Sequence, residues 1–346
     1  NNKSMSQKKK DFYQYYATMM EPWDGPASII FSDGDMMGAV LDRNGLRPSR
    51  YYITKDGFLV LSSEVGCIDI PAEDVVVKER LRPGKMLLVD TVKGKLIDDE
   101  DIKEYYSTRQ PYGEWLDQNL VHLGDLKIPN KGIEKYDKES LVRHQKAFGY
   151  TYEQIRTSIL PMAKNGTEPI AAMGADTAIP PLSQKDGPLF NYFKQLFAQV
   201  TNPPFDSIRE EIVTDTSVHL GSNGNILEEK PENCHILKIE DPILTNTDLL
   251  KIKNIDAPGL KSAVIPITYY KSTNLAKAIE HLFILADKAY KDGANIIILS
   301  DRGVDEYHVA IPSLLAVSAM QQHLVRTKKR TSISVILESA EPCEVH

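Results

Sequence analysis

The sequence of 346 residues lacks any long apolar run and any excess of basic residues. Spanning a bilayer takes roughly 18–20 consecutive apolar residues, and no stretch approaches that length. The formal net charge of −7 and the pI near 5.7 provide no basic surface of the kind that nucleic acids require. We therefore expect neither a membrane nor a nucleic acid as partner. The 42% hydrophobic content is ordinary for a globular protein, and the length suggests about two domains.

Cysteine is scarce: Cys67, Cys234 and Cys343 are odd in number and far apart. They fit neither a disulfide framework nor a zinc spacing, which favours a reducing, cytoplasmic setting. Cys67 could be a nucleophile only with a base nearby, and no histidine lies within about fifty residues of it in the sequence. A passive thiol is the favoured interpretation, with an independent Cys67 hydrolase as an alternative.

The usual cofactor and metal motifs are missing as well. There is no HExxH pair and no GxGxxG or GxxxxGK phosphate loop. Asp33, Asp35 and Asp42 do not follow the spacing of a calcium loop, so a hairpin turn is favoured over a cation site.

The first third predicts an α+β region. Residues 3–20 have helical periodicity, with aromatic residues on one face. Short apolar runs separated by turn residues then predict an antiparallel meander of about six strands. These runs and two following helices cover residues 27–31, 36–42, 50–54, 58–63, 82–97 (two strands), 99–110 and 112–123. The aperiodic stretch 122–136 is the predicted linker between a domain of residues 1–121 and one of residues 137–346.

The last third predicts a parallel sheet, so the fold class as a whole is α/β. Helical residues 141–149 and a capping-box sequence from Thr151 to Gln154 come first. Strand, helix, strand, helix, strand follow at residues 263–267, 275–293, 294–300, 311–327 and 332–339. This alternation is typical of βαβ units.

Two loops contain charged residues that could bind a ligand. Asp301 and Arg302 follow a predicted parallel strand, where open sheets place ligands. A structural ion pair is favoured there, and the alternative is that the chain is an autonomous α/β module that binds a small anionic ligand at this loop. Arg43 and Arg47 flank Asn44-Gly45, and a structural turn is favoured over an anion site.

Three longer stretches are more specific than these loops. Residues 21–54 (EPWDGPASIIFSDGDMMGAVLDRNGLRPSRYYIT) and 81–103 (LRPGKMLLVDTVKGKLIDDEDIK) resemble the closing part of the class II glutamine amidotransferase domain of glutamate synthases. Residues 197–213 (FAQVTNPPFDSIREEIV) and the segment from IIILSDRG (296–303) to the C-terminus resemble the central domain of the same large subunit. The resemblance covers essentially the whole chain, in the order of the family.

The resemblance implies an enzyme that makes two glutamates from glutamine and 2-oxoglutarate. Its amidotransferase domain, of the N-terminal-nucleophile type, hydrolyses glutamine with an N-terminal cysteine. Ammonia then passes through a tunnel to a barrel domain that holds FMN and an iron–sulfur cluster and is reduced by NAD(P)H or ferredoxin. The central domain joins these parts and resembles a degenerate barrel.

In this chain the resemblance places neither catalytic residues nor cofactor ligands. Position 1 is Asn1, the family's glutamine-binding residues precede Glu21, and the FMN domain follows His346. Asn44-Gly45 belongs to a turn and is not the oxyanion Asn-Gly of the family. Both ends look cut, so we expect an inactive piece of a larger cytoplasmic or plastid enzyme. Its expected partners are the remaining domains, with a small reductase subunit or ferredoxin for the parent.

The double-proline stretch FAQVTNPPFDSIRE (residues 197–210) is expected to form a turn that sets the direction of one helix relative to the next. Its polar residues are the candidate contacts with neighbouring domains or the tunnel: Thr201, Asn202, Asp206, Arg209 and Glu210.

Overall fold

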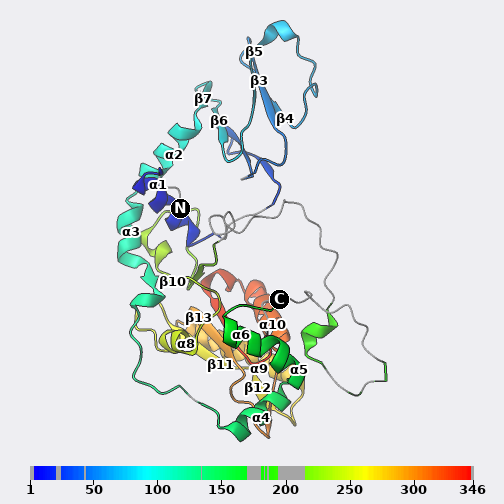
Figure 1. Cartoon of the computed structure of the whole chain (residues 1–346). Coiled ribbons are helices and arrows are strands. Elements are labelled where there is room, and N and C mark those ends of the chain that lie inside the picture. The colour runs from blue at the N-terminus through cyan, green and yellow to red at the C-terminus, as the bar shows by residue number, and fades with distance from the viewer. Residues whose placement is uncertain are drawn as a thin grey trace. The chain divides into compact units, whose positions relative to one another are not determined.

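The computed structural model describes residues 4–20, 25–42, 44–133, 135–169, 181–182, 184, 187–193 and 215–343. These residues fall into two compact units: unit 1 ends at Asp117 and unit 2 begins at Gln118. The architecture is mixed α/β, as the sequence predicts, and it contains several separate sheets (Figure 1).

Unit 1 begins with helix α1 (Gln7–Ala17), within the predicted range 3–20. Its aromatic face is confirmed, because Tyr15 is fully buried and its ring lies 5.1 Å from that of Tyr112. Tyr112 and Trp115 belong to α3 (Tyr112–Asn119), which follows α2 (Asp99–Thr108). The aromatic rings of α1 and α3 therefore form one small core.

The strands of unit 1 form two antiparallel sheets, so the single predicted meander is wrong. One sheet has the order β1 (Ser28–Ser32), β2 (Met36–Leu41), β6 (Met86–Asp90) and β7 (Lys95–Ile97). The other has β4 (Leu59–Ser62), β3 (Arg50–Thr54) and β5 (Val75–Arg80), a strand that the prediction missed. Alternating hydrophobicity indicates that a strand exists but not which strand it pairs with.

The chain changes sheet at the corner between β2 and β3. The carboxylate of Asp42 accepts hydrogen bonds from the backbone N–H groups of Ala27, Asn44 and Leu46 at 3.0–3.3 Å. Gly45 has a φ of 60°, a conformation that suits glycine. Asp42 thus fixes a structural corner, and Ala39, Leu41 and Leu87 of the first sheet pack with Tyr51 of the second.

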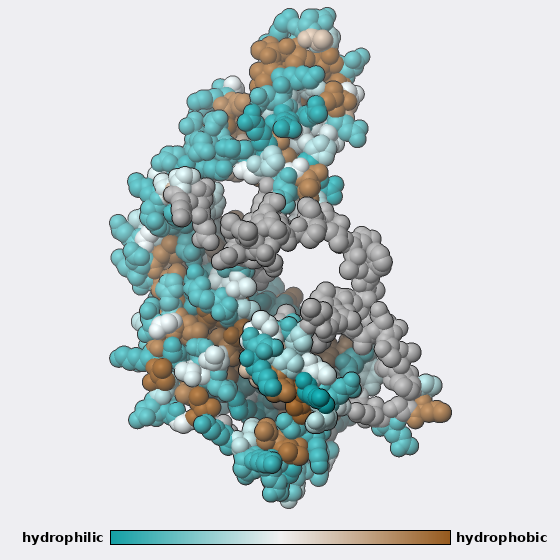
Figure 2. All heavy atoms as spheres, in the orientation of Figure 1, coloured by the Kyte–Doolittle hydropathy of each residue, from teal (hydrophilic) through white to brown (hydrophobic). Residues whose placement is uncertain are grey.

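Several large apolar side chains of unit 1 stay exposed around the second sheet. Figure 2 shows hydrophobic surface gathered over the β3–β5 region, where Phe58 and Val76 are 69% and 63% exposed.

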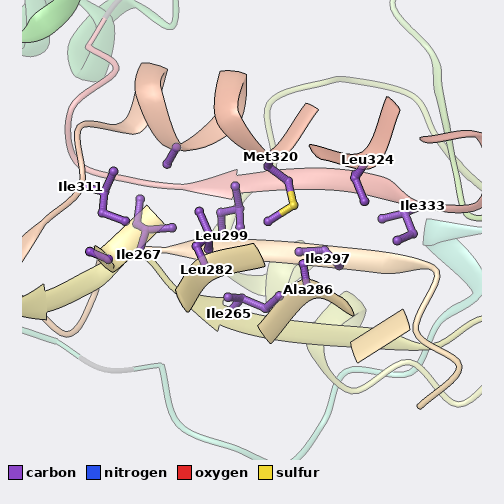
Figure 3. Packing of buried hydrophobic residues seen from close by; sticks show 12 residues of the cluster. Ile265, Ile267, Leu282, Ala286, Ile297, Leu299, Ile311, Met320, Leu324 and Ile333 are labelled. Atoms are coloured by element: carbon purple, nitrogen blue, oxygen red, sulfur yellow. The ribbon is translucent and has the colours of Figure 1, made fainter. Parts of the chain in front are cut away.

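Unit 2 is built on a parallel sheet with the order β11 (Ser262–Pro266), β13 (Ile296–Ser300) and β15 (Ser334–Glu338). The predicted βαβ units are confirmed, because α9 (Leu275–Lys291) and α10 (Ser313–Arg326) connect the three strands. Both helices pack on one face, where Leu282, Met320 and Leu324 contact the core around Ile297 and Leu299 (Figure 3).

The other face of this sheet packs on a second layer. Its members are α8 (Asn246–Lys253) and the sheet β8 (Val121–His122), β10 (Leu237–Ile239), β9 (Val218–Leu220). Ile296 and Ile298 of β13 are buried among Leu237, Leu249 and Ile252. A strand buried on both faces explains the continuous apolar run from Ile296 to Leu299. The edge strand β11 is less covered, and its Val264 is 48% exposed.

Short elements complete unit 2. A two-stranded sheet pairs β12 (Thr268–Tyr270) with β14 (His308–Ala310). Before the sheet come α4 (Lys138–Ala147), α5 (Tyr152–Gln154), a π-helical turn (Ile155–Ile159) and α6 (Leu160–Asn165). Half of the predicted capping box forms: Thr151 Oγ1 accepts from the Gln154 backbone N–H, but the Gln154 side chain donates to Cys343 Sγ. Single 3-10 turns lie at Ala72–Asp74, Leu123–Asp125, Leu189–Tyr192, Pro231–Cys234 and Arg330–Ser332.

Candidate functional site

The carboxyl ends of β13 and β15 bring the sequence-predicted pair Asp301 and Arg302 to one edge of the parallel sheet. The register pairs Ser300 with Glu338, so the residues that follow each strand are neighbours. The backbone agrees, because Asp301 N–H donates to the Glu338 carbonyl at 3.1 Å. This is the edge at which open parallel sheets place ligands.

Glu338 is the centre of a buried ionic network at this edge. One carboxylate oxygen accepts from Ser300 Oγ at 2.7 Å and from Lys253 Nζ at 2.8 Å, and the other pairs with Arg302 Nε. Burial alone would raise the pKa of Glu338, but these hydrogen bonds outweigh burial and hold the pKa below its usual range. Arg302 also donates to Asn246 Oδ1 at 3.2 Å.

Asp301 is bound differently, because it has no cationic partner among the described residues. Its Oδ2 accepts from Ser339 Oγ at 2.6 Å and from the Ala340 backbone N–H at 3.1 Å. Only 5% of the residue is exposed. Burial raises the pKa of Asp301, and the negative charges of Glu341 and Glu338 add to that effect against the two hydrogen bonds.

A cavity of about 350 Å³ lies over this edge and is lined on its other side by α4 and the π-helical turn. Figure 1 shows these green helices near the orange and red elements of the sheet layer. Aromatic and aliphatic side chains form most of its wall: Tyr136, Leu141, Phe148, Tyr150, Ile155 and Ile159. Tyr150 is fixed by a hydrogen bond from its hydroxyl to the Ala340 carbonyl at 2.6 Å. His144 also lines the cavity, and its ring lies 4.3 Å from that of Tyr136.

Sequence reasoning found Asp301 and Arg302 but missed the residues that surround them. Glu338 was hidden inside a predicted strand, although it is the last residue of a strand parallel to β13. Tyr136 and Tyr150 carried no recognisable signal, because they lie outside the sheet, before and after α4, and are far from Asp301 in the sequence. The anionic ligand suggested by the sequence is not favoured by this geometry, since Arg302 is already paired with Glu338 and Asn246.

The other group of predicted site residues cannot be placed. Thr201, Asn202, Asp206, Arg209 and Glu210 lie outside the described residues, as does Arg43. Their assignment as contacts stays a prediction.

The remaining sequence candidates have structural roles where they are described. Asp33 Oδ1 accepts from the backbone N–H groups of Asp35 and Met36, which closes the β1–β2 hairpin. Arg47 donates to the Pro26 carbonyl at 3.4 Å. The thiol of Cys67 is exposed and donates to the Glu64 carbonyl, with Ser62 Oγ 2.9 Å away. Within the described ranges no histidine hydrogen-bonds to Cys67, and no cluster of His, Cys, Asp and Glu could hold a metal ion.

None of the helices in the described part of the chain is long and apolar enough to span a membrane.

Two family models match the chain in sequence. Residues 1–115 match the class-II glutamine amidotransferases, and residues 143–346 match the glutamate synthase central domain. The second match alone covers more than half of the chain.

Curated relatives align over nearly the whole chain. The chain is 46% identical over 345 residues to a glutamate synthase [NADPH] large chain of Bacillus subtilis, with 100% of this chain and 22% of that protein covered. It is 42% identical over 359 residues to a glutamate synthase [NADH] of Schizosaccharomyces pombe, covering 100% of this chain and 17% of that one. A chloroplastic ferredoxin-dependent glutamate synthase of Oryza sativa is 41% identical over 340 residues, and the alignment covers 97% of this chain and 21% of that protein. The chain spans about a fifth of the length of these relatives and belongs to the glutamate synthase family.

Proposed function

We propose that this chain is the non-catalytic connecting region of a glutamate synthase. It would lie between the glutaminase part and the FMN-dependent part of an enzyme that converts glutamine, 2-oxoglutarate and a reductant into two glutamates. The observation that carries the proposal is the order of the two family matches, amidotransferase at residues 1–115 and central domain at residues 143–346. The division into residues 1–121, a linker at 122–136 and residues 137–346 is part of the same proposal.

The partners of this region are the other domains of the parent polypeptide, and Thr201, Asn202, Asp206, Arg209 and Glu210 are the proposed contacts with them or with the ammonia tunnel. The names of the relatives specify NADPH, NADH and ferredoxin as donors for those proteins. A reductase subunit or ferredoxin is accordingly the proposed electron source of the parent, in the cytoplasm or, for a plant-type enzyme, the plastid stroma.

The cysteines of this chain do not fit an iron–sulfur cluster. Such clusters take several convergent thiolates. Cys234 is fully buried, and burial raises the pKa of its thiol to about 11, which disfavours the thiolate. The two remaining cysteines are too few, so we assign the cluster, with FMN, to other parts of the parent.

A chimera tests this function. The aligned region of the Bacillus subtilis large chain would be replaced by this chain, at 46% identity over 345 residues. We expect the chimera to retain flavin, to hydrolyse glutamine and to make glutamate in step with that hydrolysis. A chimera that retains flavin and glutaminase activity but releases free ammonia without glutamate would contradict the connecting role.

A further inference from the structure

The cavity at the carboxyl end of the parallel sheet holds an unusual combination: one buried carboxylate without a cationic partner, and several aromatic rings. We propose that it is a binding site for a small primary amine that carries an apolar or aromatic group. This inference goes beyond the connecting role, and it does not depend on that role.

The first argument is the hydrogen bonding of Asp301. Both hydrogen bonds that the described residues give to this carboxylate go to Oδ2, from Ser339 and Ala340. Oδ1 has no such donor, and it is not among the buried atoms that lack both partner and solvent. A side chain that is 95% buried therefore keeps one acceptor oxygen open, and the residue lines the cavity. An ammonium group is the donor that such an oxygen binds most strongly.

The second argument is the local charge. Among the described residues, three carboxylates lie together here, those of Asp301, Glu338 and Glu341. Two cations accompany them, Lys253 and Arg302, and both are paired with Glu338. Glu341 accepts from the backbone and hydroxyl of Ser313 at the start of α10 and is not ion-paired in the described structure. One further positive charge would balance the site, and a ligand cation next to Asp301 would supply it.

The third argument is the aromatic lining of the cavity. Tyr136, Phe148 and Tyr150 line the same cavity as Asp301. Aromatic faces attract organic cations and also accept the apolar body of a ligand. A volume of about 350 Å³ lies within the range of small-molecule sites, roughly 300–1,000 Å³. Carboxylate and rings together specify an amine with an apolar group rather than a bare metal ion or an anion.

Calorimetric titration of the full chain with three probes of similar shape tests the charge preference. The probes are 2-phenylethylamine (a cation at neutral pH), 2-phenylethanol (neutral) and phenylacetate (an anion). We expect the amine to bind at least about tenfold more tightly than the alcohol, a difference of about 1.4 kcal/mol, and phenylacetate to bind more weakly than both. Equal affinity for amine and alcohol, tighter binding of phenylacetate, or no binding of the amine at up to about 10 mM would overturn the proposal.

The substitution Asp301→Asn tests whether the preference for the amine depends on the charge of Asp301. The amide oxygen can still accept from Ser339 and Ala340, so the fold is kept, while the negative charge is lost and a donor faces the ligand. We expect the amine and the alcohol to bind this variant with about equal affinity. The melting temperature should not fall, because ionising a carboxyl whose pKa is raised by burial costs stability. A variant that folds and keeps the amine preference would contradict the assignment.

Two further variants serve as controls. Asp256→Asn makes the same change at an exposed residue without a described partner, and the preference should be unchanged. Phe148→Leu removes one aromatic ring from the wall of the cavity and leaves its charge unchanged. It should lower the affinities for the amine and for the alcohol together. Loss of the preference in Asp256→Asn, or unchanged affinities in Phe148→Leu, would place the binding outside this cavity.

Discussion

Glu338 is the residue on which the charge balance of the sheet edge depends. Its carboxylate forms ion pairs with both Lys253 and Arg302 while only 8% of the residue is exposed. Removing one member of a buried ion pair leaves the other charge without compensation, which typically costs 3–5 kcal/mol.

We expect Glu338→Gln to lower the free energy of unfolding by about 3 kcal/mol, measured by urea denaturation. The amide keeps the shape and the acceptor for Ser300 but leaves Lys253 and Arg302 without the carboxylate with which both are paired. Glu280→Gln, on the exposed side of α9, is the control and should change stability by less than about 0.5 kcal/mol. Equal effects of the two substitutions would show that the network contributes nothing.

The lowered pKa of Glu338 also predicts that the stability of the protein depends on pH. Hydrogen bonds to the ionised form hold the pKa of Glu338 below its usual range. The stabilisation it gives is therefore fully present above the unfolded-state pKa and lost as the pH falls through the folded-state pKa. Denaturation at a series of acidic pH values should show that the free energy of unfolding of the wild type declines as the pH falls, and that this decline is shallower in Glu338→Gln. Identical pH dependences of the free energy of unfolding in the two proteins would contradict the assignment.

Asp42 has a comparable role in unit 1, where it binds backbone instead of cations. Burial would raise its pKa, but hydrogen bonds from backbone N–H groups of Ala27, Leu46, Asn44 and Gly45 lower it overall. We expect Asp42→Ala to destabilise unit 1 by about 1–3 kcal/mol, because the N–H groups lose their acceptor. The exposed Asp69→Ala should have little effect in the same denaturation experiment.

At the scale of elements, α10 shows why unit 2 is stable. Its Ala316, Met320 and Leu324 recur at helical spacing and are fully buried against the sheet. The helix has no side-chain cap at its own N-cap, Pro312; Glu341 supplies a carboxylate to Ser313 from beyond β15. A negative charge there also interacts favourably with the helix dipole.

Two identical substitutions on α10 separate packing from helix propensity. Leu324 is fully buried and Leu314 is 40% exposed. Leu324→Ala should cost about 2–5 kcal/mol, since it removes core contacts and leaves a cavity, and Leu314→Ala should cost less than about 1 kcal/mol. The measurement is thermal or urea unfolding of both variants, and similar losses would contradict the packing that Figure 3 shows.

At the scale of the whole molecule, we expect the isolated chain to be inactive. The purified protein should release no ammonia from glutamine and should show no flavin absorbance. The reasons are that the resemblance places the nucleophilic cysteine and the FMN site outside this chain, and that no histidine among the described residues hydrogen-bonds to Cys67. Ammonia release that disappears in Cys67→Ser would favour the alternative of an independent hydrolase.

The family and the parallel sheet could be predicted from the sequence because both depend on local signals. The apolar run at residues 296–299 and the helices around it identify βαβ units without knowledge of their neighbours. The position of Asp301 and Arg302 after a parallel strand likewise follows from topology. Strand pairing in unit 1 could not be predicted, since β2 pairs with β6 across more than forty intervening residues.

The sequence by itself determined the βαβ elements of the parallel sheet, which loop ends the central strand and which family the chain resembles. Only the tertiary structure decided what surrounds that loop. Glu338, Lys253 and Tyr150 reach it from three separate segments, and their arrangement pairs Arg302 while leaving Asp301 without a cation. The physical reason is that charge compensation and burial depend on distances between side chains, which sequence separation does not specify.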